Sequence, residues 1–287
     1  MLPLVLSAAL VAPAQPPSHD AANAVYKALI DPGLVVGPTQ RVKFAPPVMS
    51  DGLSAAQQRA VIEKVIGTDY PFAEFTRQSV VAPQVVRIGD AKPSDPAAPA
   101  RTVDVYFVAY GDFAVADDEK FLDRLTRAGQ GTGTGRSLTA ADLEKRKIAP
   151  PDPKREGFGL AEFDFLEKVR LRLVGRATWS KSGESVVAAA EVDPRFTADP
   201  EFPNQWQALS KEGGAQKVGP ATPYGGAGMY LRMTRLHEPA GAIFVEQHVV
   251  FAEPAGWFAG ANLLRSKLPA AVQINVRAMR REWLKGK

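Results

Sequence analysis

The pair of residues that best suits acid–base chemistry is Glu246 and His248, in the apolar segment 242–251. Residues two apart on a β-strand share one face and lie roughly 7 Å apart. A histidine beside a carboxylate can act as a general base, whereas a metal site normally needs three protein ligands. Phe244 and Val250 share the same face, which equally fits a half-buried structural pair. The sequence therefore assigns no catalytic residue, keeps Glu246 and His248 as candidates, and predicts neither a metal nor a cofactor.

Other motifs with catalytic potential depart from their patterns. The glycine run GQGTGTGRS (129–137) has Gln130 and Arg136 where a phosphate-binding loop needs glycine and lysine. No serine stands in a G-x-S-x-G elbow. The chain has no cysteine, which excludes thiol catalysis, thiolate metal sites, disulfides and an acylated cysteine. These observations favour a protein that is not an enzyme.

The segment DPRFTADPEFPNQW (193–206) is rich in proline, acids and aromatics. Its oxygen-bearing side chains are Asp193, Asp199, Glu201 and Asn204. Their spacing misses the calcium-loop pattern, and each residue before a proline is held in an extended or turn geometry. The aromatic side chains that can anchor it are Phe196, Phe202 and Trp206. We expect a structural lid on the sheet edge or cavity mouth, with Asp193 and Arg195 ion-paired.

The element that must organise these residues is a C-terminal helix over 256–284, kinked at Pro269. Its apolar stripe is Trp257, Ala261, Leu264, Leu268, Val272, Val276, Met279 and Trp283. A hairpin of strands 228–236 and 242–251 can supply the large apolar partner that this stripe needs. Further helices are predicted at 20–30, 54–67, 117–128 and 139–147, and further strands at 83–89, 101–113, 163–179 and 184–192. Alternation of basic and apolar residues over 168–172 predicts that the opposite face of the sheet is solvated.

This order of elements resembles the helix-grip fold of the START and polyketide-cyclase-like superfamily. The resemblance covers most of the chain and lies in element order, so no functional residue is carried over. It implies an α+β fold with a curved antiparallel sheet wrapped around a long C-terminal helix, and a cavity between them. The segments DPRF…PNQW and WFAGANLLRSKLP also look like those of an uncharacterised group of exported bacterial proteins.

We therefore expect the protein to bind a hydrophobic or lipid-like small molecule in that cavity. The alternatives are a cavity-based hydrolase or cyclase-like enzyme using His248 and Glu246, and a structural protein of the cell envelope. The residues expected to line the ligand site are Tyr106, Tyr110, Trp206, Tyr230, Met233, Trp257 and Leu264.

The chain termini and the charge suggest where the protein works. Residues 1–14 form an apolar run ending in Ala12-Pro13-Ala14, which predicts a cleaved signal peptide and a secreted or periplasmic protein; a buried N-terminal helix is the alternative. Residues 15–287 are expected to form one monomeric domain.

The net charge of +4 is too small to predict a nucleic-acid partner. The basic residues of the last helix are typical of the solvated side of an amphipathic helix, and a peripheral contact with anionic membranes is the alternative: Arg265, Lys267, Arg277, Arg280, Arg281, Lys285 and Lys287.

Overall fold

The computed structural model describes residues 18–37, 40–92, 99–118, 120–121, 133–257 and 263–285. The signal peptide predicted for residues 1–14 and most of the helix predicted for 117–128 lie outside these ranges. Export from the cytoplasm therefore stays a prediction. Among the described helices, none is both long and apolar enough to span a membrane.

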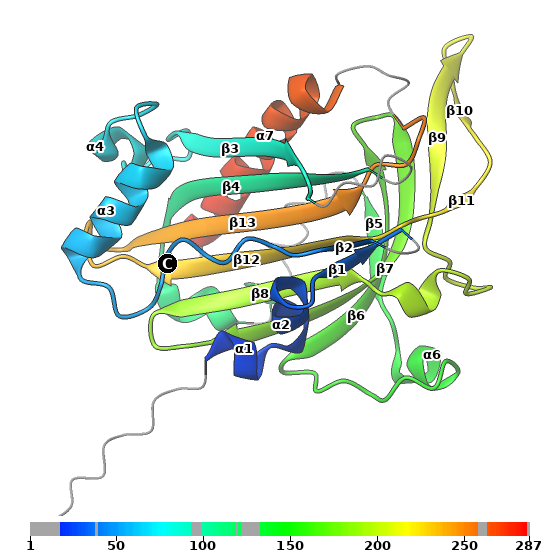
Figure 1. Cartoon of the computed structure of the whole chain (residues 1–287), viewed down its shortest axis with the longest axis horizontal. Coiled ribbons are helices and arrows are strands. Elements are labelled where there is room, and N and C mark those ends of the chain that lie inside the picture. Colours follow the sequence, from blue (N-terminus) through cyan, green and yellow to red (C-terminus); the bar gives the residue numbers. More distant parts are fainter. Residues whose placement is uncertain are drawn as a thin grey trace, which may run out of the picture.

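One antiparallel sheet forms the body of the described chain (Figure 1), and 11 strands belong to it. Its main path runs in the order β10-β9-β7-β8-β12-β13-β4-β3, with β11 beside β9, β6 beside β7 and β5 beside β6. The strands are β3 (Gln84–Asp90), β4 (Ala100–Tyr110), β5 (Thr134–Ser137), β6 (Glu156–Phe165), β7 (Val169–Lys181), β8 (Ser185–Val192), β9 (Gln205–Glu212), β10 (Ala215–Val218), β11 (Thr222–Pro223), β12 (Ala227–Arg235) and β13 (Ala242–Ala252). The sheet is strongly curved, and β9 and β10 stand steeply to β3 and β4.

The long C-terminal helix α7 (Leu263–Lys285) packs against β3 and β4 on one face of the sheet, here called the helix face. Its buried side chains are Leu264, Leu268, Val276, Met279 and Trp283. They belong to the same hydrophobic core as Phe107 and Val245, which lie opposite each other on β4 and β13. The predicted α+β fold, a curved antiparallel sheet with a long C-terminal helix, is confirmed. Trp257 was expected in the helix but lies in a turn before it, and Arg280, expected on the solvated side, is buried.

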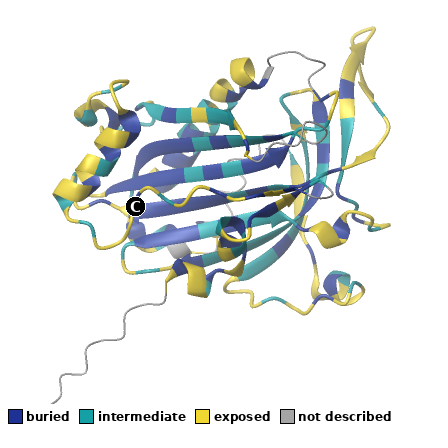
Figure 2. Cartoon of the chain, in the orientation of Figure 1, coloured by how far each residue is buried: buried dark blue, intermediate teal, exposed yellow. Residues whose placement is uncertain are grey.

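The opposite face of the central strands is covered by residues 18–75 and is here called the N-terminal face (Figure 1). The covering elements are α1 (His19–Ala22), α2 (Ala24–Ile30), the small sheet of β1 (Leu34–Val36) and β2 (Gln40–Val42), α3 (Ala55–Ile66) and α4 (Phe72–Phe75). Tyr106 and Phe244 on this face pack with Ile62 and Phe75. Figure 2 shows the central strands largely buried. The expectation of a solvated second face is therefore wrong for the central strands, although Arg170 and Arg172 on β7 remain half-exposed.

Local signals predicted some elements well and missed others. The helix at 54–67 is α3, and Ser54 and Gln57 form the predicted capping box. The single strand expected at 163–179 is instead two strands, β6 and β7. They are joined by a turn in which Leu166 and Glu167 have positive φ, and such a turn without glycine leaves little sequence signal. The predicted helix at 20–30 is interrupted at Asn23, and the predicted helix at 139–147 is the short α6 (Ala140–Glu144).

The segment 193–206 is pinned to the outer side of β6 and β7. Phe196 and Phe202 are buried in a cluster with Phe158 and Val174, which lie on the face of these strands turned away from α7. The Asn204 side chain is buried and joins β7 to the loop: it accepts from Val174 N at 2.7 Å and donates to the Asp193 carbonyl at 2.7 Å. The predicted aromatic anchoring of Phe196 and Phe202 is confirmed, and the loop lies on the sheet rather than at a cavity mouth.

Ion pairs occupy the carboxylates of the same loop. Arg195 binds both oxygens of Asp193, as predicted, and Arg146 binds both oxygens of Asp199. The hydrogen bonds from Arg146, and after them those from the amides of Phe202 and Glu201, lower the pKa of the Asp199 carboxyl to about 2. The acids therefore have protein partners, which favours the structural interpretation over a calcium site.

Candidate functional site

The helix face of the central strands carries a group of apolar side chains, half of them alanines, that are only half-buried. In the register, Trp179 lies opposite Ala188, and the next pair along is Ala177 and Ala190. On β12 and β13, Leu231 and Gln247 continue the row of Trp179 and Ala188. Met229 and Val249 continue the row of Ala177 and Ala190. We call the half-buried apolar members the alanine patch: Ala177, Trp179, Ala188, Ala190, Met229 and Val249.

This partial exposure is unusual because β7, β8, β12 and β13 are inner strands of the sheet. Inner strands of a sheet covered on both faces normally bury their apolar side chains. Helix α7 packs on β3 and β4, to one side of the patch. The alanine methyl groups also fill less space than the valine or isoleucine typical of strands. The patch is thus an accessible apolar surface in the concave side of the sheet.

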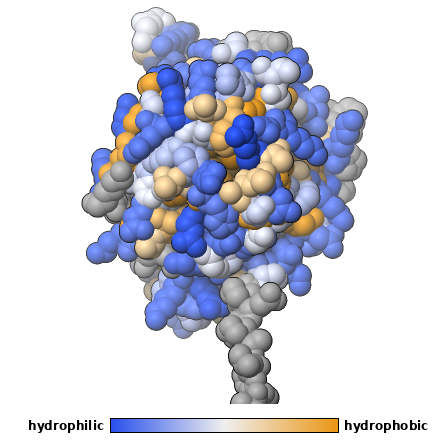
Figure 3. All heavy atoms as spheres, turned by 90° about the vertical axis from the view of Figure 1, so that its left-hand side faces the viewer, coloured by the Kyte–Doolittle hydropathy of each residue, from blue (hydrophilic) through white to orange (hydrophobic). Residues whose placement is uncertain are grey.

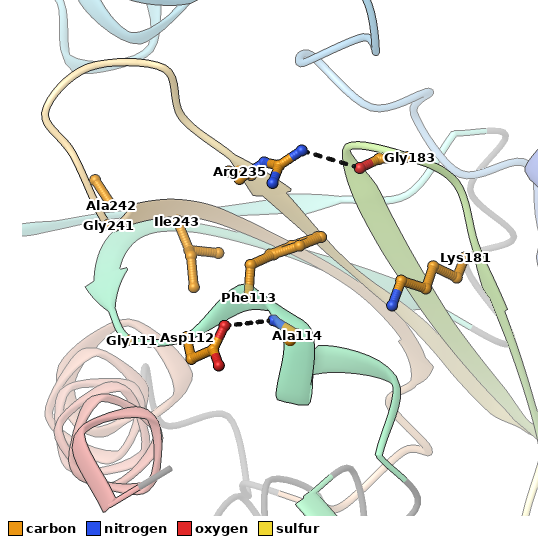
Figure 4. A pocket seen from close by; sticks show the side chains of 10 residues that line it. All are labelled: Gly111, Asp112, Phe113, Ala114, Lys181, Gly183, Arg235, Gly241, Ala242 and Ile243. Carbon is orange, nitrogen blue, oxygen red and sulfur yellow. Dashed lines mark hydrogen bonds between the residues drawn. The ribbon is translucent and has the colours of Figure 1, made fainter. Parts of the chain in front are cut away.

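A cleft of about 430 Å³ lies on the same face, at the strand ends (Figure 4). Its lining residues are Gly111, Asp112, Phe113, Ala114, Lys181, Gly183, Arg235, Gly241, Ala242 and Ile243. They come from the ends of β4, β7 and β12, the start of β13, and the short helix η1 (Phe113–Asp117). The cleft lies toward the end of the molecule that faces the viewer in Figure 3, where hydrophobic residues show between hydrophilic ones.

The cleft combines an apolar floor with a basic rim. Phe113 and Ile243 form the floor, and the Arg235 guanidinium carbon lies 5.7 Å from the centre of the Phe113 ring. Arg235 Nη2 donates to the Gly183 carbonyl at 3.2 Å. The Lys181 side chain extends from β7 toward Phe113 (Figure 4). The third charged group, Asp112, accepts from Ala114 N at 2.9 Å and thereby caps η1.

The cleft and the alanine patch are neighbours on one face. Lys181 is two residues from Trp179 and four from Ala177 along β7, so the three side chains share a face. Lys181 is exposed and the other two are half-buried. On β8 and on β12, the next strand after it, the corresponding residues Val186 and Met233 are buried. The accessible connection between cleft and patch therefore runs along β7.

The residues predicted to bind ligand do not gather at one place. Met233 and Leu264 lie on the helix side of the sheet, buried. Trp206 and Trp257 contact each other in an aromatic cluster with Tyr224, and Trp257 precedes the first residue of α7 in the sequence.

The three tyrosines among those predicted residues lie on the N-terminal face, which corrects the prediction. Tyr106 stacks near Phe244, Tyr230 donates its hydroxyl to the Ala45 carbonyl at 2.7 Å, and Tyr110 donates to the Thr76 carbonyl. They cannot line a space between the sheet and α7. Sequence reasoning favoured aromatics and missed the alanines, although the run VVAAAEV was a signal of low side-chain volume in a strand.

Glu246 and His248 also lie on the N-terminal face, as a buried structural pair, and not in a cavity beside α7 as the enzymatic alternative requires. His248 Nδ1 is 2.7 Å from Asp104 Oδ1, and Nε2 is 3.5 Å from Glu246 Oε2. The His248 ring stacks on Tyr230, with ring centres 4.6 Å apart. Burial lowers the pKa of His248, but the hydrogen bond to Asp104 and the nearby Glu246 carboxylate outweigh it, so the net shift is upward.

The Glu246 carboxylate holds the covering segment in place. It accepts from Val48 N at 2.8 Å and from Met49 N at 3.3 Å, and its side chain is fully buried. Within the described ranges no cluster of three or more histidine, cysteine or acidic side chains is placed to hold a metal ion. The arrangement is that of a structural network beneath residues 18–75.

A second histidine on the N-terminal face makes stability depend on pH. His19 Nδ1 is 2.7 Å from Ser180 Oγ, and Nε2 is 2.8 Å from Ser185 Oγ. Burial, followed by the charge of Arg232, lowers the pKa of His19 to about 4, although Asp51 and Asp20 oppose this shift. The neutral imidazole is therefore the form that fits the folded protein.

We expect the free energy of unfolding to fall as the pH drops from 6.5 to 4. In this window His19 takes up a proton in the unfolded chain but stays neutral in the folded protein. The stability that the neutral His19 contributes is therefore complete above pH 6.5 and is lost as the pH falls to 4, a change of up to about 3 kcal/mol. Urea unfolding of the wild type and of His19→Asn at pH 7 and pH 4.5 measures the difference. The variant should show a smaller drop; equal drops in both proteins would contradict the prediction.

Comparisons with known proteins bear on the fold. No family model matches the sequence, and no curated protein matches it. Among solved structures, the chain is similar to human STARD10, with 10% identity, a TM-score of 0.37 and coverage of 83% of this chain and 87% of that one. It is also similar to the human StarD13 (DLC2) lipid transfer and protein localization domain, with 8% identity, a TM-score of 0.36 and coverage of 74% and 92%.

A bacterial structure is similar as well. An uncharacterised protein from Rhizobium leguminosarum has 9% identity and a TM-score of 0.33, with coverage of 66% of this chain and 98% of that one. The solved structures to which the chain is similar thus include STARD10 and StarD13. At these identities the likeness concerns the fold alone.

Proposed function

We propose that this protein binds a hydrophobic or lipid-like small molecule on the helix face of its sheet, over the alanine patch. The observation that carries the proposal is that apolar side chains on inner strands, Ala188 and Trp179 among them, stay half-exposed. Exposed apolar surface in a concavity is the usual property of a ligand site. The nearby cleft of about 430 Å³ falls in the size range of such sites.

The side chains of the patch suit a flexible apolar ligand. Trp179 offers a large flat surface and Met229 an adaptable thioether, while the alanines leave room between them. A ligand that buries roughly 300 Å² of apolar surface gains about 7 kcal/mol before the costs of association are subtracted. The affinity of a simple neutral alkyl probe is therefore expected to be no tighter than about 10 μM, and weaker by the costs of association.

Filling the patch should weaken this binding. We expect Ala188→Trp to weaken the binding of 1-decanol at least about tenfold, equivalent to 1.4 kcal/mol, because the indole occupies the space that the probe would take. Isothermal titration calorimetry measures the affinity, and circular dichroism checks that the variant is folded. Ala270→Trp, at an exposed position of α7, is the matched control and should bind like the wild type.

Two results would count against the proposal. Wild-type protein that takes up no decanol up to the solubility limit of the probe would remove the binding function. Decanol bound equally by the wild type and Ala188→Trp would place the site elsewhere than the alanine patch.

A further inference from the structure

We infer that the ligand carries an uncharged hydrogen-bonding group, a hydroxyl or a carbonyl, which binds the Gln247 carboxamide on the helix face of the sheet. This inference rests on the proposed function and specifies the chemical class of its ligand. The alanine patch accounts for the apolar part of such a molecule. Gln247, beside the patch on β13, accounts for the polar part.

Gln247 is a polar side chain in apolar surroundings. Glu246 and His248 point to the N-terminal face, so alternation along β13 points Gln247 to the helix face. On the helix face of β4, β8, β12 and β13, the other side chains away from the strand ends are apolar. Two neighbours of Gln247 lie opposite it on β12 and β4, and two flank it along β13: Leu231, Val105, Val245 and Val249.

The Gln247 carboxamide is open to a ligand. The side chain is half-buried and makes no hydrogen bond within the part of the chain that the structure describes. A carboxamide offers an acceptor oxygen and two N–H donors. At such a position on an inner strand an apolar side chain would pack better, and residues that break a local rule without a compensating contact are expected at functional sites. The unused bonding capacity of Gln247 therefore suits a polar group of the ligand.

The surroundings of Gln247 favour an uncharged group over an ion. The charged helix-face residues of the same four strands stand at strand ends: Arg101 is ion-paired with two acids, and Arg235 shares the cleft with Asp112. The buried guanidinium of Arg280 on α7 is hydrogen-bonded to main-chain carbonyls. An ionic head group at Gln247 would leave water without a counter-charge, which costs far more than moving a hydroxyl or a carbonyl.

The polar and apolar parts can belong to one short molecule. Gln247 and Val249 are two residues apart on one strand face, which places their side chains roughly 7 Å apart. Across the sheet, β12 separates Gln247 from Ala188, a distance of about 10 Å between the strands. An alkyl chain whose hydroxyl binds Gln247 can therefore lie over Val249 and the alanines.

The test is a double-mutant cycle in which one change is made in the protein and the other in the probe. The probes are 1-decanol and 1-chlorodecane, in which chlorine replaces the hydroxyl. Headspace gas chromatography above solutions with excess protein measures the bound fraction of each. In Gln247→Met the decanol affinity should fall at least about fivefold, because the hydroxyl loses its partner. The chlorodecane affinity should stay the same or rise.

Three controls accompany the cycle. Gln84 is also a half-buried glutamine on the helix face, but it lies on the edge strand β3, and Gln84→Met should leave both affinities unchanged. The urea midpoint of Gln247→Met should equal or exceed that of the wild type, because no contact within the protein is lost. Decanoate at pH 8, even in about tenfold excess, should not displace decanol.

The outcomes separate this inference from the proposed function. A ratio of decanol to chlorodecane affinity that is the same in the wild type and Gln247→Met, or that Gln84→Met changes equally, would overturn the polar contact and leave the proposed function standing. A lower urea midpoint for Gln247→Met would also overturn it, since the amide would then serve the fold. Displacement of decanol by decanoate would overturn the uncharged class. Failure of both neutral probes to bind the wild type would overturn the proposed function itself.

Discussion

Replacing Arg280 by alanine should lower the free energy of unfolding by about 4 kcal/mol. Arg280 comes from α7, and its side chain is almost fully buried. It donates four hydrogen bonds to main-chain carbonyl oxygens, those of Val80, Ala82, Pro83 and Val108. Its guanidinium carbon also lies 5.4 Å from the centre of the Phe107 ring. Alanine would leave these carbonyls without a donor and open a cavity beneath the helix.

The neighbouring Arg281 provides a matched control, because its side chain is exposed. Urea unfolding should show a large drop in the midpoint for Arg280→Ala, at an unchanged slope, and little change for Arg281→Ala. Arg280→Lys should fall between the two, since an ammonium cannot reproduce the planar fork of donors. Urea midpoints that fall equally for both alanine variants would show that the buried hydrogen bonds of Arg280 contribute nothing to the free energy of unfolding.

Arg280 also helps to explain why the alanine patch stays accessible. Its hydrogen bonds tie α7 to residues 80–83 and to β4, which keeps the helix on the β3–β4 side of the sheet. The C-terminal end of α7 also contacts the chain at Gly111. A Cβ at this position would lie 2.7 Å from the Trp283 carbonyl oxygen, so only glycine lets the end of α7 approach this closely. The position of the helix is thus fixed by specific contacts, and the concave face of β7 and β8 remains outside its cover.

The fold could be predicted from local patterns because its main elements have strong periodicity. The stripe of α7 repeats at helical spacing, and the hairpin of β12 and β13 alternates on either side of a short turn. Arg280 shows where this reasoning ends. In the sequence it looks like a solvated residue beside Arg281, and only carbonyls from distant segments make its burial favourable.

The site was harder to predict than the fold. Alternation shows that Tyr106 and Phe107 point to opposite faces of β4, but both faces are buried, so it cannot tell which one meets α7. The covering of the N-terminal face by residues 18–75 depends on long-range contacts, such as that of Val48 with Glu246. For the same reason Glu246 and His248 were placed correctly on one strand face, while the enzymatic alternative placed that face wrongly beside the helix.

Glu246→Ala should also destabilise the protein strongly, by about 4 kcal/mol. The buried carboxylate accepts from the main-chain amides of Val48 and Met49 and helps to raise the pKa of His248. Without it two amide donors are left unsatisfied, and the segment that carries them loses its anchor on the sheet. Urea unfolding measures the global loss. Hydrogen exchange at the amides of residues 48 and 49 should accelerate beyond the global change, because the segment can then open locally.

Two further variants separate a structural carboxylate from a catalytic one. Glu246→Gln keeps one acceptor oxygen and should cost roughly half as much as alanine, while Glu212→Ala, exposed on β9, should change little. A Glu246→Ala protein with wild-type stability and exchange rates would favour the enzymatic alternative, since an acid buried without a structural role is typical of active sites. The geometry points the other way: both Glu246 oxygens are bound to main-chain amides, and His248 is enclosed between Asp104 and Tyr230. A substrate could reach them only if the covering segment first came off the sheet.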